Sequence, residues 1–266
     1  MQRNIQILVV MFAVACLPAN LQAQDNDRIS LRLTYLARYT AFVEHPRLHT
    51  DTMRLDVGQR FSSFYSLPQL RSQQFMDKVN REGRDIEYVK RNAPATFGQA
   101  YSVFKKQPEC DSITFFDKFI VHTFKVVEHM KTAWNLLDGD STICGYACKK
   151  AQTEIRGRTW VAWYAMEIPI ADGPWKLHGL PGAILYAHST DGRFYFDCIG
   201  IAASPSETIA WPSGHITQCA LKTYLNAYYR FKENPMDALP NIKVMPGVEL
   251  PKATVQDKAI SIEECR

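Results

Sequence analysis

One short pattern in the sequence has the residue types for nucleophilic catalysis. Ser102-Val103-Phe104-Lys105 matches Ser-x-x-Lys, whose chemistry requires a helix that places the hydroxyl and the amine on one face. The surrounding stretch, QAYSVFKKQ, has the pattern of a strand, in which positions three apart face opposite sides of the sheet. We therefore expect no catalytic pair at this position.

Metal-ligand patterns are equally incomplete. Asp138-Gly139-Asp140 resembles the start of a calcium loop, but position twelve of that loop would be Lys149 instead of a bidentate acid. His45 and His49 have helical spacing, yet Pro46 between them breaks the helix that the spacing needs. No Gly-x-Ser-x-Gly elbow, His-Glu-x-x-His helix or phosphate-binding glycine loop occurs. The sequence therefore assigns no catalytic residue, no metal ligand and no cofactor.

The most chemically diverse cluster is Trp175, Lys176 and His178, in the stretch GPWKLHGLPGAILY. Aromatic rings beside a cation and an imidazole can line a ligand pocket. Aromatic residues of the neighbouring predicted strands would complete its wall; they are Trp160, Tyr164 and Tyr186. The alternative is that these side chains cap the edge of a sheet.

A rigid corner follows this cluster. In Leu180-Pro181-Gly182-Ala183, proline is second and glycine third, where a type II turn needs a fixed φ and a positive φ. Gly179, just before, allows a close backbone approach or another unusual dihedral angle. We predict that Gly179, Leu180, Pro181 and Gly182 aim a strand over residues 183–189 into a sheet.

Glycine-centred turns indicate how the sheet is built. Asp138-Gly139, Arg156-Gly157 and Asp191-Gly192 each separate stretches rich in β-branched and aromatic residues. Asp-Gly is a strong signal for a two-residue hairpin turn, and Arg-Gly is a weaker one because positive φ is strained for Arg. Three antiparallel hairpins are predicted between residues 113 and 201.

The hairpin at Asp191-Gly192 can be aligned residue by residue. With a two-residue loop, His188 faces Tyr195 and Tyr186 faces Asp197. One face then reads as core, with Leu185, Ala187, Phe194, Phe196 and Cys198. The opposite face is polar and aromatic, which predicts partial exposure to water.

Two amphipathic helices and a tail complete the pattern. A capped helix is predicted from Ser66 and Pro68 onwards, and a second one over residues 221–231. Four prolines after residue 234 favour an extended tail. The predicted fold class is mainly β with helices (α+β): a curved antiparallel meander sheet, or a partly closed barrel, packed by two helices. The predicted organisation is a cleaved signal peptide at 1–23, a single β-rich domain at 24–233 and a tail at 234–266.

The first 23 residues predict export. Arg3 precedes an apolar run that is too short to span a bilayer, and a small residue, Ala23, ends the segment as a signal peptidase requires. The predicted location is the periplasm or cell envelope; secretion, or a lipoprotein anchored through Cys16, stays open. Cleavage changes the net charge only from +4 to +3, which argues against nucleic acid as a partner. No later segment is apolar enough to be transmembrane.

Cysteine usage supports the same compartment. Without Cys16 an even number remains, and we expect disulfides among them, with no connectivity fixed by the sequence. The candidates are Cys110, Cys144, Cys148, Cys198, Cys219 and Cys265.

Several motifs resemble those of a known family. GPWKLHGLPGAI looks like the signature of the GLPGLI family of exported Bacteroidota proteins, with Ala183 in place of the second leucine. DTMRLDVG, FSSFYS, ICGYACKKA and GRTWVAWYAMEIPIADGPWK match the style of the family between residues 51 and 190. The resemblance implies an exported protein of undefined activity and carries over no catalytic residues.

Two functional hypotheses follow. The first is a non-enzymatic envelope protein that binds an unknown small ligand or an envelope protein on the aromatic face of its sheet. The second is an envelope hydrolase of unrecognised type, which would need His178 or His188 hydrogen-bonded to Asp197 with a hydroxyl on the other side.

Overall fold

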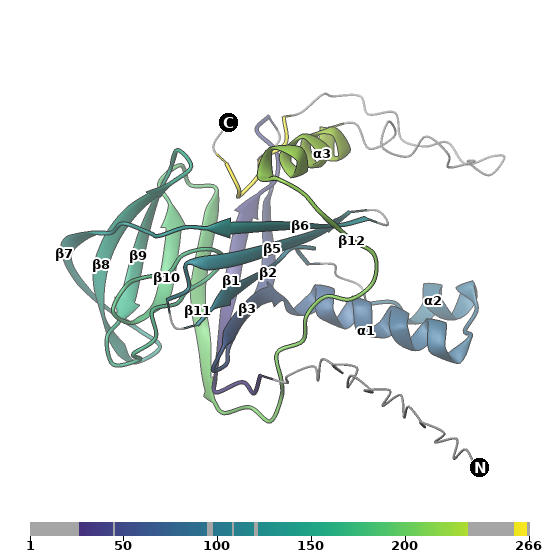
Figure 1. Cartoon of the computed structure of the whole chain (residues 1–266), viewed down its shortest axis with the longest axis horizontal. Coiled ribbons are helices and arrows are strands. Elements are labelled where there is room, and N and C mark those ends of the chain that lie inside the picture. The colour runs from purple at the N-terminus through teal and green to yellow at the C-terminus, as the bar shows by residue number, and fades with distance from the viewer. Residues whose placement is uncertain are drawn as a thin grey trace, which may run out of the picture.

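The structure of the chain is a computed structural model that describes residues 27–44, 46–94, 98–107, 109–119, 122–233 and 258–264. The predicted signal peptide, Cys16 and Cys265 lie outside these ranges, as does most of the predicted tail at 234–266. Within the described part, twelve strands form one curved sheet, and three helices accompany it (Figure 1). The mainly β, α+β fold class is therefore confirmed.

The strands pair mostly with their neighbours in sequence. They are β1 (Leu31–Thr40), β2 (Leu48–Val57), β3 (Phe61–Ser66), β4 (Ser102–Lys106), β5 (Ser112–Phe119), β6 (His122–His129), β7 (Asn135–Ile143), β8 (Tyr146–Ile155), β9 (Arg158–Ala165), β10 (Ala183–Ser189), β11 (Phe194–Ala203) and β12 (Ile216–Gln218).

The sheet is open, and its order is β12-β6-β5-β4-β3-β2-β1-β11-β10-β9-β8-β7. Two meanders, β1 to β6 and β7 to β11, are joined side by side where β1 pairs with β11. All pairs are antiparallel except β12 with β6. The open sheet decides between the two predicted alternatives, because its edge strands β7 and β12 stand at opposite ends of the order.

Two of the three predicted hairpin turns are confirmed. Gly192 has φ 72° between β10 and β11, and the register pairs His188 with Tyr195 as predicted. Arg156 and Gly157 both adopt positive φ between β8 and β9. The prediction at Asp138-Gly139 is wrong, because this pair is a bulge inside β7 and the turn is made at Cys144 and Gly145, with φ of 51° and 84°.

The predicted type II turn at 180–183 is also wrong. Gly182 does not adopt positive φ, and the amide of Ala183 donates to the carbonyl of Ile168 (2.9 Å). Glycine is needed there for another reason: a Cβ at Gly182 would collide with the backbone of Ala165 at the end of β9. The unusual dihedral expected at Gly179 is present, with φ 91°.

Both predicted helices exist, and a third one was missed. α1 (Leu67–Glu82) begins at Ser66, whose hydroxyl accepts from the amide of Gln69 (3.2 Å), and it ends at left-handed Gly83. α3 (Leu221–Glu233) buries Tyr224, Leu225 and Tyr229. The short, largely exposed α2 (Ile86–Asn92) has no apolar stripe that the sequence could have revealed.

The GPWKLHG stretch lies inside the molecule. Lys105 on β4 is completely buried, forms an ion pair with Asp172 and donates to the carbonyls of Gly173 (2.6 Å) and Trp175 (2.9 Å). Trp134 donates from Nε1 to the carbonyl of His178 (2.8 Å). This stretch therefore links β4 of one meander to the chain just before β7 of the other.

Residues 258–264 of the predicted tail are packed into the core. Residues 259–263 are almost fully buried, and Phe42 and Ala259 form an antiparallel bridge. In Figure 1 this segment lies beside the end of α3. Residues 258–264 thus belong to the same body as the sheet.

The disulfide prediction is not confirmed. Among the five cysteines that the structure describes, Cys110, Cys144, Cys148, Cys198 and Cys219, no pair is bonded. The thiol of Cys144 instead donates to the backbone carbonyl of Cys198 (3.0 Å). Burial raises the pKa of the Cys198 thiol to about 12, so this thiol stays protonated at neutral pH.

Candidate functional site

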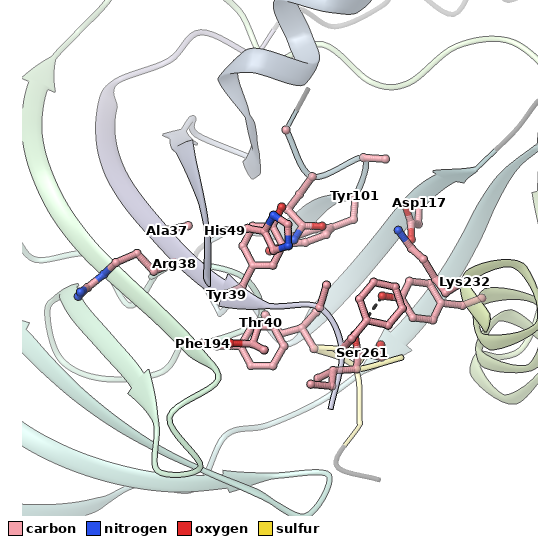
Figure 2. A pocket seen from close by; sticks show the side chains of 18 of the residues that line it. Ala37, Arg38, Tyr39, Thr40, His49, Tyr101, Asp117, Phe194, Lys232 and Ser261 are labelled. Atoms are coloured by element: carbon pink, nitrogen blue, oxygen red, sulfur yellow. Dashed lines mark hydrogen bonds between the residues drawn. The ribbon is translucent and has the colours of Figure 1, made fainter. Parts of the chain in front are cut away.

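A cavity of about 310 Å³ opens between the ends of β1 and β11, strand β5, helix α3 and the C-terminal segment (Figure 2). Eight of its 21 lining residues are phenylalanine or tyrosine, and three others, Arg38, Asp117 and Lys232, carry a charged side chain. It is lined by residues 37–42, His49, residues 98–101, Phe115, Asp117, Phe194, Phe196, Tyr224, Tyr228, Lys232 and residues 260–262.

Aromatic packing fixes the shape of this cavity. The ring of Tyr101 stacks on that of Phe115 at 5.7 Å, and Phe115 meets Tyr224 edge to face at 5.3 Å. At the more exposed end, Tyr39 stacks on His49 at 5.4 Å. Rings held in this way present rigid apolar surfaces, the usual lining of a small-molecule site.

Asp117 places a carboxyl group in this aromatic wall. It belongs to the inward row of β5, is 7 % exposed, and accepts a hydrogen bond at Oδ2 from the hydroxyl of Tyr224 (2.7 Å). Burial raises the pKa of Asp117 to about 6, although Tyr224 and Lys232 act in the opposite direction. Figure 2 shows Asp117 and Lys232 on the same side of the cavity.

A second carboxyl group holds the wall formed by residues 98–101. Asp51 on β2 accepts from the amide of Gln99 at Oδ2 (2.7 Å) and from the hydroxyl of Ser66 at Oδ1 (3.0 Å). Burial raises the pKa of Asp51. Gly98 packs so closely on this pair that a Cβ would overlap both side chains. The cap of α1 and the cavity wall therefore share one buried carboxylate.

Another cavity of about 310 Å³ uses residues 99–101 as its wall too. It lies between α1 and residues 207–213. Two carboxylates of its lining, Asp56 and Glu207, are already paired with Arg32 (2.5 Å and 2.8 Å). We therefore treat the aromatic cavity as the stronger candidate site.

The six predicted ligand contacts occupy other positions. Trp160, Tyr164, Trp175, Lys176 and His178 are buried, Tyr186 is half-buried, and none of the six lines either cavity. Trp160 contacts a residue of the cavity wall, because its ring stacks on that of Phe196 with the ring centroids 6.1 Å apart. A ligand-binding role for the six stays a prediction that nothing here tests.

Lys176 and His178 are engaged with protein groups. Lys176 Nζ contacts the carboxylates of Glu128 (2.5 Å) and Glu263. His178 has a carbonyl near each ring nitrogen, Lys176 O at 2.8 Å from Nδ1 and Met130 O at 3.0 Å from Nε2. Burial nevertheless lowers the pKa of His178. These contacts hold the stretch in place inside the sheet.

The constellation expected of a hydrolase does not form among the described residues. Asp197 pairs with Arg38 (2.7 Å), and neither His178 nor His188 is hydrogen-bonded to it. No three His, Cys, Asp or Glu side chains of the described ranges gather closely enough to hold a metal ion. Within the same ranges, no helix has the length and hydropathy needed to cross a bilayer.

Sequence reasoning missed the aromatic cavity because its walls come from distant segments. One signal was available: Asp117 is the acid in the otherwise apolar inward row of β5, after Ile113 and Phe115. A lone acid in such a row indicates a carboxyl group facing the interior. Nothing local indicated that Tyr224 and residues 260–262 meet it there.

Comparisons with known proteins give a match to a family model over a short part of the chain, and they give no activity. A family model described as "Protein of unknown function (Porph_ging)" matches residues 148–186, which include the GPWKLHGLPG stretch. No curated protein matches the chain.

Solved structures add a partial likeness. Two of them, "Structure of PNGF-II in P21 space group" and "Structure of PNGF-II in C2 space group", align with TM-scores of 0.47 at 14 % and 13 % identity. Each alignment covers 74 % of this chain and 32 % of the solved chain, so this chain spans about a third of those proteins. At this level the likeness carries no statement about activity.

Proposed function

We propose that the protein is an exported, non-enzymatic binding protein whose aromatic cavity takes a small, uncharged ring compound with a hydroxyl group. The observation that carries the proposal is the placement of Asp117 in a wall of aromatic rings. A carboxylate accepts about four hydrogen bonds, so Asp117 keeps acceptor capacity beyond its bond from Tyr224.

Charge and size support this ligand class. Asp117 and Lys232 are opposite charges at the same cavity, which favours an uncharged ligand over an ion. The rings of Tyr101 and Phe115 offer flat surfaces to a ring compound. A volume of about 310 Å³ is at the lower end of small-molecule sites and suits a molecule of one or two rings.

Titration with 2-naphthol and naphthalene tests the proposal, since the two probes differ only in a hydroxyl group. We expect saturable binding of both, and Asp117→Asn should weaken 2-naphthol by about tenfold because a hydrogen bond to a charged group is lost. Naphthalene binding should change little. Tyr101→Leu should weaken both probes, because the stacked wall is removed.

The matched control is Glu154→Gln, which removes one negative charge from an exposed position on β8. Its affinities should equal those of the wild type. The proposal fails if neither probe binds saturably, or if Asp117→Asn weakens naphthalene as much as 2-naphthol. Native mass spectrometry of protein from its own host would then identify a natural ligand as a mass excess over the denatured protein.

A further inference from the structure

The C-terminal segment, residues 258–264, is bound by the rest of the protein in the manner of a recognised peptide. Its backbone pairs with residues 41–43, which follow β1. The amide of Val43 donates to the carbonyl of Lys258 (3.1 Å), and the amide of Ile260 donates to the carbonyl of Ala41 (2.9 Å). Main-chain bonds of this kind supply affinity when an extended peptide adds to a strand.

Arg158 on β9 donates hydrogen bonds to the backbone of the same segment at residues 261–264. Its guanidinium is 2 % exposed and donates from Nη1 to the carbonyls of Ser261 (3.2 Å) and Ile262 (3.1 Å), and from Nη2 to that of Glu264 (3.1 Å). Nε of the same group is anchored by Asp191 (3.1 Å). A buried cation that donates to three backbone carbonyls of one short segment is a built peptide contact.

The side chain of Glu263 supplies the specificity. Its carboxylate is fully buried and accepts from Trp175 Nε1 (2.8 Å) and Arg156 Nη1 (2.8 Å), and it also contacts Lys176 Nζ. Lys176 has no exposed surface, so losing this carboxylate would leave a buried cation with only Glu128 as a counter-ion. We call the site formed by Arg156, Arg158, Trp175 and Lys176 the groove. It strongly favours an acidic side chain over a neutral one at the position of Glu263.

We propose that this groove is a peptide-binding site for a short acidic segment with the pattern Ile-x-Ile-Glu, which the chain fills with its own residues 260–263. The inference goes beyond the small-molecule proposal, because it rests on contacts made by Arg156, Arg158 and Lys176 outside the aromatic cavity. Residues 234–257 separate the segment from α3, so its position is set by these non-covalent contacts.

The test uses the full chain with a protease recognition sequence inserted after Gly247. After cleavage, the C-terminal fragment should stay bound in native mass spectrometry. A fluorescein-labelled peptide of residues 256–264, QDKAISIEE, should then displace it, with a saturable rise in anisotropy. The uncut protein should bind the same peptide far more weakly, because the tethered segment has the advantage of a high effective concentration.

Matched peptides test the specificity. The Glu263→Gln peptide should bind at least about a hundredfold more weakly, because it leaves the buried cation Lys176 with only Glu128 as a counter-ion. The Lys258→Gln peptide, which also changes one charge, should bind within about threefold of the parent, because Lys258 is exposed and contributes its backbone carbonyl.

Loss of the fragment could also unfold the cut protein, and a second measurement covers that case. Removing the fragment and adding back QDKAISIEE should restore tryptophan fluorescence, and the melting temperature should rise with peptide concentration by mass action. The proposal is overturned if peptide at about 1 mM neither binds nor restores the fold. It is also overturned if the Glu263→Gln and Lys258→Gln peptides behave alike.

Discussion

At the scale of single residues, the structure repeatedly places polar groups inside the protein and satisfies them there. Lys105, Lys176 and His178 all occur in or against the GPWKLHG stretch, and each one is almost fully buried. The sequence analysis placed Lys176 and His178 either in the wall of a ligand pocket or at the edge of a sheet, whereas such deep burial is rare for a lysine. The carboxylate partners of Lys176, Glu128 and Glu263, come from remote segments, and so does Met130, whose carbonyl lies near Nε2 of His178; this explains why the sequence did not reveal the burial.

Asp117 gives a pH-dependent contribution to stability. Its pKa rises from 3.8 in the unfolded chain to about 6 in the fold, so its contribution is greatest below pH 3.8 and is lost as the pH rises through 6. Asp117→Asn removes this dependence. Between pH 4.5 and pH 8, we expect the unfolding free energy of the variant to gain about 2 kcal/mol relative to wild type. Urea titrations at both pH values check this, and a constant difference between the two proteins would refute it.

Gly182 is required for close packing. We expect Gly182→Ala to lower the free energy of unfolding by about 1–3 kcal/mol, because the new methyl group meets the backbone of Ala165, which cannot move without disturbing β9. Gly200→Ala on β11 is the matched control, since a Cβ there meets nothing within 4 Å, and it should be neutral or slightly stabilising. Equal denaturation midpoints for the two variants would contradict this account.

At the scale of elements, local turn chemistry and strand alternation predicted much of the second meander. The β10–β11 register followed from Asp191-Gly192, and its core and exposed faces have the predicted burial. The failure at Asp138-Gly139 shows the limit of that reasoning. Cys144 adopts a positive φ that is uncommon for a residue with a side chain, so the sequence favoured the wrong pair.

Ser66 joins two elements through one hydroxyl group, because it caps α1 and donates to Asp51. Ser66→Ala should therefore cost about 2–3 kcal/mol, more than the loss of an ordinary N-cap, since a buried carboxylate also loses a donor. Ser72→Ala, at a buried hydroxyl of α1 that lacks a partner among the described residues, should be neutral. Guanidinium denaturation compares the two, and a Ser66 cost no larger than that of Ser72 would disprove the shared role.

At the scale of the whole molecule, the sheet gathers residues that no sequence window contains together. The aromatic cavity needs β1, β5, β11, α3 and the C-terminal segment, and its walls meet because β1 pairs with β11 and brings the two meanders side by side. Turn and strand patterns predicted much of the second meander. They carried no information on that junction, and a proline-containing tail gave no sign that residues 259–263 are buried.

Because residues 260–262 line the cavity, its occupancy and the docking of the C-terminal segment are coupled. A ligand that contacts the docked segment must stabilise it against local opening. With 2-naphthol at about 100 times its Kd, amide hydrogen exchange at residues 259–263 should slow by up to about a hundredfold where local opening governs exchange. Amides of β8, which do not line the cavity, report any general stabilisation and should slow much less. Equal slowing in both regions would show that the segment never opens separately, whereas no slowing with probe bound would place the probe outside this cavity.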